Sequence, residues 1–414
     1  MKYQNGKYEK KTQKLEGKAV PDWIDTYVEE TKKVPSPEIF RLWSAITAIS
    51  GVLERKVWTT GSAGEIYPNL FTVLVGPPAS GKDNAIRPIR ELWAKINMLN
   101  LAPDNVTKAS LIDVLSRSMR TIMNGSSAPY IFSALSVPAP EFGVFFTHHD
   151  TEFLSVLNHI YGSPPSYKEE RRSAGIVEVN KPHLVLLSGT QPDYLNGFLP
   201  EEAWGMGFTS RLLLIYSGEH PKADLFAMQA QQSYTLLPDL KKLFDLKGQF
   251  VWSKNAIDEI NAWNQAGCPP APTHSKLLHY NGRRALHAIK LSMISAASRS
   301  GELYVTIEDF ERAKDWLLAA EVTMPDIFRA MGQRSDMQII ADLHFHLYRI
   351  WSSVAVDKRQ PLVDKDLYGF LHSRVPSEKI KNIIDTAVKT GYFRQGTYPG
   401  EWIPNTLTRQ FGNA

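Results

Sequence analysis

The feature that most constrains the fold is the stretch LFTVLVGPPASGKDNAI, residues 70–86. An apolar run of strand length leads directly into a loop of small residues, and a helical pattern, IRPIRELWAKINML, follows. Gly76, Gly81 and Lys82 occupy the three invariant places of a G-x-x-x-x-G-K phosphate loop. Strand, loop and helix in this order are the context that such a loop requires, so we expect a site for the phosphates of a nucleotide.

In such a loop, backbone N–H groups and the positive end of the following helix face the ligand, while the lysine reaches the outer phosphates. Asp83 departs from the motif, because a Ser or Thr hydroxyl normally contacts the magnesium ion there. A carboxylate also suits Mg²⁺, but without the metal it would repel the phosphates. We therefore predict that ATP binding depends on the metal and that hydrolysis can be slow. The alternative is a nucleotide site that serves only the structure of the protein. The expected contacts are Gly76, Pro77, Pro78, Ala79, Ser80, Gly81, Lys82, Asp83 and Asn84, with Asp83 on the metal.

Further apolar runs predict more strands of the same sheet. YIFSALSVPAPEF, HLVLLSG and SRLLLIYSG lack polar alternation, and helical patterns near residues 107–123 and at TEFLSVLNHIY separate them. Continuous apolar strands separated by helices indicate a parallel sheet covered on both faces. The predicted fold class is therefore α/β, a three-layer P-loop NTPase domain of the RecA-like or AAA+-like kind.

Hydrolysis requires a carboxylate at the end of a neighbouring strand, to hold magnesium and orient the attacking water. Glu141 ends the stretch ALSVPAPEF, with Pro140 where a metal-holding Asp would usually stand, and it is our first choice. Asp150 or Glu152, after GVFFTHHDTEF, is the alternative. The adjacent His148 and His149 would point to opposite faces of a strand, so we interpret them as ordinary loop residues.

Polar residues near two more strands complete the predicted catalytic set. Gln191 or Thr190, in SGTQPD, could sense the γ-phosphate, unless the segment is merely a turn before a helix. Arg211 precedes the last strand and could act as an arginine finger towards a neighbouring subunit, or else be an ordinary surface or ion-paired residue. Arg283 and Arg284 begin a helix that could bring an arginine over the nucleotide, with core or surface ion pairing equally open.

The end of the chain predicts a second kind of module. Two short helical patterns, DKDLYGFLHSR and SEKIKNIIDTAVKTG, precede YFRQGTYPGEWIPN, which reads as two short strands around a Pro-Gly turn. This order resembles a winged helix. Such modules bind duplex DNA or mediate protein contacts, and we favour DNA. The expected DNA-binding cations are Lys379, Lys381, Lys389 and Arg394, with Tyr398 or Trp402 as accompanying aromatics.

Length and composition predict several domains. A chain of 414 residues exceeds one ordinary core, and 43% hydrophobic with 22% charged residues is typical of a globular protein. One cysteine, Cys268, excludes an internal disulfide bond. The net charge of +4 is modest, and six Lys against two Glu in residues 1–18 account for it. The expected parts are a basic tail at 1–18, a helical lead-in at 19–59, the P-loop core at 60–221, a helical lid at 222–350 and the winged-helix-like domain at 351–414.

The order of these parts resembles the uncharacterised P-loop ATPase family of phages and mobile elements, which is helicase-like and often associated with primase-polymerase modules. The motifs that carry the resemblance are PNLFTVLVGPPASGK, the xPEF-type acidic segment, KPHLVLLSGTQPDYL and GFTSRLLL, within roughly residues 20–330. It implies Lys82 on the phosphates, Glu141 as catalytic acid, Gln191 as sensor and Arg211 as finger. Asp83 and Pro140 depart from the family pattern at magnesium ligands.

The resulting expectation is an oligomeric helicase or translocase, powered by Mg-ATP hydrolysis and acting on single-stranded or forked DNA. Replication partner proteins are a further expectation. Two alternatives stay open: a non-motor ATP-binding helicase loader, initiator or DNA-recognition adaptor, and a nucleotide-gated regulatory protein. No apolar run approaches the roughly 18–20 residues that span a bilayer, and no signal-peptide core is present, so we expect no membrane partner and a cytoplasmic location, in the host if a phage encodes the chain.

Overall fold

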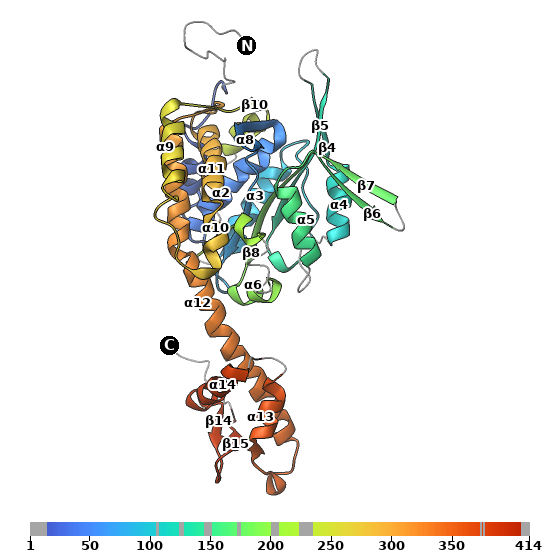
Figure 1. Cartoon of the computed structure of the whole chain (residues 1–414), viewed down its shortest axis with the longest axis vertical. Helices are drawn as coiled ribbons and strands as arrows, with labels where there is room; N and C mark the ends of the chain where they lie inside the picture. The colour runs from blue at the N-terminus through green and yellow to red at the C-terminus, as the bar shows by residue number, and fades with distance from the viewer. Residues whose placement is uncertain are drawn as a thin grey trace. The chain divides into compact units, whose positions relative to one another are not determined.

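The computed structural model describes residues 15–104, 107–123, 128–144, 151–171, 175–199, 207–222, 235–372, 375 and 377–406. The chain divides into two compact units, Met1–Ile327 and Phe328–Ala414 (Figure 1). Within the described residues, every helix is too short or too polar to cross a lipid bilayer.

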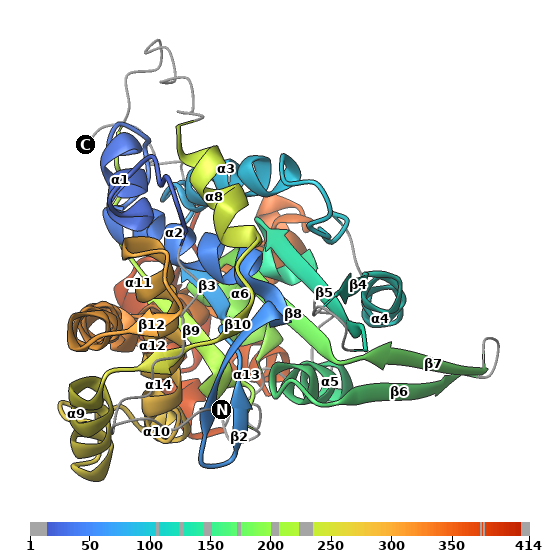
Figure 2. The ribbon, with the colours of Figure 1, turned by 90° about the horizontal axis from the view of Figure 1, so that it is seen from above.

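Five strands form the central sheet of the first unit, in the order β4-β5-β8-β3-β9 (Figure 2). β3, β5, β8 and β9 run parallel to one another, and β4 pairs antiparallel with β5 at the edge. The predicted α/β fold with a parallel sheet is confirmed in part, because the sheet is mostly parallel and has one antiparallel strand. The bounds are β3 Phe71–Val75, β4 Met119–Ile122, β5 Tyr130–Ala139, β8 Pro182–Thr190 and β9 Leu212–Tyr216.

Helices cover both faces of this sheet, which explains its continuous apolar strands. Neighbouring residues of a strand point to opposite faces. On one face, Thr72 of β3 accepts a hydrogen bond from the hydroxyl of Thr47 at 2.8 Å, in helix α2 (Glu38–Leu53). On the other face, the ring of Phe71 packs edge-on against Tyr161 at 4.9 Å, at the end of α5 (Thr151–Tyr161). Every residue of β3 and β8 is consequently buried.

The helical lead-in folds onto the sheet domain. The first helix, α1 (Trp23–Glu30), begins at Asp22, whose side chain accepts a hydrogen bond from the backbone N–H of Asp25. The second, α2, is buried almost all round, because it packs between α1, α3 (Lys82–Ala94) and the sheet. After it, β1 (Val57–Gly61) and β2 (Gly64–Ile66) form an antiparallel hairpin.

The helix expected over residues 107–123 was wrong in its second part. Helix α4 (Lys108–Arg117) ends at Ser118, and residues Met119–Ile122 form β4 instead. These residues pair with Tyr130–Ser133 of β5. Pairing with a strand further along the chain overrides the local helical pattern, and such a partner leaves no local signal.

A second hairpin was also absent from the predicted elements. β6 (Ser166–Arg171) and β7 (Gly175–Asn180) pair antiparallel and project beside α4 and α5 (Figures 1 and 2). Lys, Glu and Arg residues fill β6, so its sequence lacks the apolar alternation of an ordinary strand.

The predicted helices after the sheet are confirmed, and three short strands join them. β10 continues the β1 sheet as a parallel strand, and β11 pairs with β12. The long helix α12 contains the boundary between the two units. The elements are α6 Pro192–Phe198, α8 Leu236–Phe244, β10 Gly248–Gln249, β11 Val251–Trp252, α9 Lys254–Gln265, α10 Leu278–Asn281, α11 Arg284–Arg299, β12 Tyr304–Val305 and α12 Ile307–Ser352.

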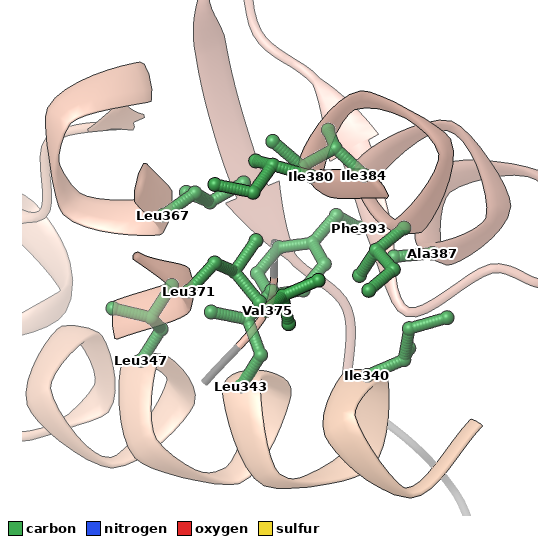
Figure 3. Packing of buried hydrophobic residues seen from close by; sticks show 11 residues of the cluster. Ile340, Leu343, Leu347, Leu367, Leu371, Val375, Ile380, Ile384, Ala387 and Phe393 are labelled. Atoms are coloured by element: carbon green, nitrogen blue, oxygen red, sulfur yellow. The ribbon is translucent and has the colours of Figure 1, made fainter. Parts of the chain in front are cut away.

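The second unit has its own hydrophobic core, to which the last part of α12 contributes (Figure 3). Ile340, Leu343 and Leu347 follow one another at helical spacing, and they pack against apolar residues of α13 (Asp364–Leu371) and α14 (Ser377–Lys389). A small antiparallel sheet completes the unit, in the order β13-β15-β14. Its strands are β13 Leu362–Val363, β14 Phe393–Gln395 and β15 Glu401–Pro404.

Candidate nucleotide-binding site

The phosphate-loop sequence lies at the carboxyl edge of the sheet. β3 ends at Val75, and the loop emerges between the ends of its two neighbours. The backbone N–H of Gly76 donates to Thr190 O at 3.1 Å, at the end of β8, and that of Ser217 donates to Val75 O at 3.1 Å, after β9. The loop then enters α3, which begins at Lys82. The sheet edge thus fixes where the loop begins, and the first turn of a 13-residue helix fixes where it ends.

Two glycines of the loop have no room for a side chain. A Cβ atom on Gly76 would lie 2.7 Å from Ser80 Oγ and 2.8 Å from Ser217 O. Gly81 has a φ of +80°, and its Cβ would lie 2.2 Å from Pro35 O. Positive φ is the conformation that glycine adopts at least cost. The two glycines of the motif are therefore required by the backbone itself.

Lys82 folds back over the loop. Its Nζ donates to Gly76 O at 2.9 Å, to Pro77 O at 2.8 Å and to Ser80 Oγ at 3.1 Å. All three acceptors are oxygen atoms of the loop itself. Phosphate oxygens bound there would compete for the same ammonium, with the added attraction of opposite charge.

A cavity of about 640 Å³ lies over the loop. This volume is within the usual range for small-molecule sites. Three strand ends contribute to its lining: the loop after β3, the segment after β5 and the end of β8 with the start of α6. Gly189 permits this convergence, because a Cβ there would lie 2.6 Å from Pro140 O and 3.3 Å from Lys82 Cβ.

The structure brings most of the predicted site residues to this cavity. Residues Pro78–Asn84 of the loop line it, together with Glu141, Thr190 and Gln191. Glu141 directly follows Pro140 at the end of β5 and is exposed. Gln191 precedes α6 in an extended conformation, and its side chain does not cap that helix. Glu141 and Gln191 therefore border the same space as Lys82.

Asp83 and Asn84 begin α3 on the same side. Asp83 is exposed and lines the cavity. The side-chain amide of Asn84 donates to Pro35 O at 3.0 Å, so it also ties the loop to the lead-in helices. No cluster of three metal-ligating side chains exists in the described part of the chain. Magnesium in nucleotide sites is commonly held by one or two carboxylates together with phosphates, and Asp83 and Glu141 fit that donor set.

The alternative acidic residues are placed differently. Glu152, on α5, is exposed and forms an ion pair with Lys108, and it is not among the residues that line the cavity. Asp150, His148 and His149 lie outside the described residues.

Arg211 lies at the amino ends of the parallel strands, whereas the phosphate loop lies at their carboxyl ends. It comes directly before Leu212, which pairs with Phe71 at the start of β3. The five residues of β3 separate the amino end of the strand from its carboxyl end, a distance of about 16 Å. NH1 of Arg211 donates to Gly207 O at 2.6 Å. Burial, and after it the nearby charge of Arg283, lower the pKa of Arg211 to about 10.

The arginine pair at the start of α11 also lies away from the loop cavity. Arg284 is fully buried, and its Nε and NH2 donate to the two carboxylate oxygens of Glu321 at 2.7 and 2.6 Å. Its role is core ion pairing, one of the two readings open from the sequence. Arg283 donates from Nε to Ser210 Oγ at 3.0 Å, beside Arg211.

Sequence reasoning missed Gly143 and Gly189, which line the cavity, and two aromatic residues of its lining. Phe142 follows Glu141 and is fully buried, and Tyr194 on α6 lines the cavity with 56% of its surface exposed. Both lie within three residues of a predicted site residue, so proximity in the chain was the available signal.

The predicted DNA-binding cations all belong to the second unit. Lys379, Lys381 and Lys389 are exposed on α14, and Arg394 is exposed on β14. Asp385 is exposed on α14 as well, so this helix surface is mixed in charge. Tyr398 is 67% exposed, whereas the indole N–H of Trp402 donates to Asp364 at 2.6 Å.

Comparison with known proteins adds no family to this geometry. The chain matches none of the protein-family models, and a search of curated proteins finds no relative.

Proposed function

We propose that this chain is a magnesium-dependent P-loop ATPase that acts on DNA, as an oligomeric helicase or translocase. One observation carries the proposal: Lys82 at the start of α3, Glu141 after β5 and Gln191 after β8 border one cavity, over a loop in which Gly76 and Gly81 leave no room for a Cβ atom. A cation for phosphates, a carboxylate for metal or water and a polar sensor are the groups that phosphoryl transfer requires.

The order of strands supports a more specific fold assignment, a RecA-like or AAA+-like P-loop domain. β8 lies between β3, which precedes the loop, and β5, which precedes Glu141. One strand, β8, therefore separates Glu141 from the phosphate loop, and Gln191 follows the end of that strand. This separation leaves a space for phosphates and an attacking water between the two sides of the cavity.

Each residue then has a defined task in hydrolysis. The backbone N–H groups of the loop and the ammonium of Lys82 bind the phosphates, since both present hydrogen-bond donors to an anion. Glu141 orients and deprotonates the attacking water, and Asp83 accepts a share of the metal coordination. Gln191 donates a hydrogen bond towards the outermost phosphate. Magnesium, when bound, neutralises the charge that develops during transfer.

Two further features support work on DNA by an oligomer. The second unit has the order helix, strand, two helices and two strands, which suits a winged helix, and it exposes cations on α14 and β14. Arg211 is too far from the loop cavity of its own chain to stabilise charge there. In a ring, it would serve the nucleotide of the adjacent subunit.

The test is ATP turnover by the full chain with magnesium, alone, with single-stranded DNA and with a forked duplex. We expect turnover that DNA stimulates, and its loss in Lys82→Ala. Lys241→Ala, an exposed lysine on α8, is the matched control and should retain turnover. If the chain shows no ATP turnover, or if Lys82→Ala turns over ATP as fast as the wild type, the proposal that the chain is an ATPase is wrong.

A non-motor loader or initiator is the second candidate. Asp83 stands where a hydroxyl usually contacts magnesium, and Pro140 stands where an acidic residue usually does. Both departures favour binding of ATP over rapid turnover. Unwinding of the forked duplex with consumption of ATP would exclude this candidate, whereas ATP-dependent DNA binding without unwinding would support it.

A further inference from the structure

A second cavity, of about 600 Å³, lies in the first unit away from the phosphate loop. Its lining comes from the β1–β2 hairpin, the turn after α5, helix α9 and one side of α11. Arg283, Leu286 and Lys290 lie on that side of α11 at spacings of three and four residues. Asn69, directly before β3, also lines the cavity. The cavity is therefore near the amino ends of the strands, whereas the phosphate loop is at their carboxyl ends.

Cations gather at one end of this cavity. Lys290 is buried, and its Nζ lies 3.9 Å from the centre of the Tyr161 ring. The guanidinium carbon of Arg211 lies 6.0 Å from the same ring. Ser210 connects the group further, because its Oγ accepts from Arg283 Nε at 3.0 Å. Three positive side chains thus surround the end of α5.

Among the described residues, the hydrogen-bond partners of these three side chains are neutral oxygen atoms. In the described ranges of the chain, neither Arg211, Arg283 nor Lys290 forms an ion pair. Lys290 Nζ donates only to neutral oxygens of Asn69, at 2.8 and 3.0 Å. Burial, followed by the charges of Arg283 and Arg211, holds the pKa of Lys290 well below its ordinary value. A buried cation is ordinarily paired, and Lys290 has no anionic partner among the described residues, so this end of the cavity suits an anion.

Unpaired donors face the same space. The two terminal nitrogens of Arg283 have no hydrogen bond to any described residue. The hydroxyl of Tyr161 is buried and has no hydrogen-bond partner among the described residues, and Tyr161 lines the cavity with 3% of its surface exposed. A guanidinium fork, an ammonium and a phenol hydroxyl are together suited to a phosphate group.

The rest of the lining is mainly apolar. Trp252, Ile257 and Ile260 come from β11 and α9, and Leu286 and Ile289 come from α11. The amides of Asn261 and Asn264 add a few polar groups, and Glu65, the one acidic side chain of the lining, accepts a hydrogen bond from Tyr67. Such walls suit an aromatic ring, and the volume suits a nucleotide.

We propose that this second cavity binds a small phosphorylated aromatic molecule of the nucleoside monophosphate class, with Arg283, Lys290 and Tyr161 contacting the phosphate. The site is distinct from the phosphate loop, so it would provide a place where a nucleotide regulates the chain or is recognised by it.

The test is calorimetric titration of AMP and UMP into the full chain carrying Lys82→Ala, which removes the lysine of the first site. We expect binding of at least one of them, with adenosine or uridine alone and inorganic phosphate alone both weaker. Adding Arg283→Gln should weaken binding by about tenfold or more, as the loss of a charged hydrogen-bond donor does. Lys290→Met, of similar shape, should do the same.

Lys254→Gln is the control, since this exposed lysine is on α9 outside the lining. The proposal is overturned if neither nucleotide binds, or if Arg283→Gln and Lys290→Met both bind as tightly as the control. It is also overturned if Arg283→Gln leaves AMP and UMP binding intact but abolishes ATP turnover in the otherwise unaltered chain. That result would assign Arg283 to the nucleotide of an adjacent subunit instead.

Discussion

Three glycines, Gly76, Gly81 and Gly189, set the geometry of the candidate site. Each lies where a Cβ would collide with backbone or side-chain atoms at 2.8 Å or less. They let the loop, the lead-in helices and the end of β8 approach one another. The first two were evident from the motif. Gly189 was not, because its close neighbours Pro140 and Lys82 are distant in the chain.

His287 makes stability depend on pH. It is fully buried, with Nε2 3.0 Å from Ser210 O, and its Nδ1 has no hydrogen-bond partner in the part of the chain that the structure describes. Burial lowers its pKa to about 3, and the charges of Lys290, Arg283 and Arg211 act in the same direction against the bond to Ser210. The unfolded chain therefore binds one more proton than the folded chain between pH 6.5 and about 3.

We predict that the free energy of unfolding falls as pH is lowered through this window, by at most about 1.4 kcal/mol per pH unit from this residue. Urea unfolding of the wild type and of His287→Gln at pH 7, 6, 5 and 4 measures it. The variant should lose less stability on acidification than the wild type. Part of the pH dependence should remain, because burial also lowers the pKa of His183. Equal slopes in the two proteins would contradict the assignment.

At the scale of elements, the sequence predicted the strands that are buried on both faces, because burial determines their residue types. The predominantly apolar residues 71–75 and 182–190 are buried on both faces, and their lack of polar alternation therefore indicated a parallel sheet. The short strand at residues 119–122 escaped, since its pairing with β5 is not local. Glu141 and Gln191 could be chosen because they follow strands whose carboxyl ends lie at one edge. The position of Arg211 required the register of β9 against β3.

A buried ion pair between Arg284 and Glu321 joins α11 to α12, in addition to the contacts of Arg299 and Ser295 with Asp309. Arg284 and Glu321 are both buried, and Glu321 also accepts a hydrogen bond from the hydroxyl of Tyr280 at 2.9 Å. Burial raises the pKa of Glu321 against the effect of Arg284. Removing one partner of such a pair leaves a buried charge without compensation.

We predict that Arg284→Met lowers the free energy of unfolding by about 3–5 kcal/mol. The double variant Arg284→Met/Glu321→Gln should recover at least about 1 kcal/mol of that loss, because no charge is then stranded. Urea unfolding at pH 7 provides the comparison, with Lys241→Ala as the surface control. A double variant whose loss equals or exceeds the sum of the two single losses would refute this account of the contact.

At the scale of the whole molecule, the chain combines a sheet domain with a second unit that has a separate core. The candidate nucleotide site, with Lys82, belongs wholly to the first unit, and the exposed cations of α14 and β14 belong to the second. Helical patterns and turn residues were enough to predict α13, α14, β14 and β15 of the second unit, whereas β13 was not predicted. The core of the second unit was harder to predict from the sequence, because Ile340 and Leu343 come from α12, a helix that begins in the first unit.

The most direct measurement is calorimetric titration of ATP into the full chain, with magnesium and with a chelator in its place. The account predicts magnesium-dependent binding to the wild type and to Lys241→Ala, and binding at least tenfold weaker in Lys82→Ala. Binding that is absent from the wild type, or as tight in Lys82→Ala as in the control, would contradict the claim that residues 76–82 form a phosphate site.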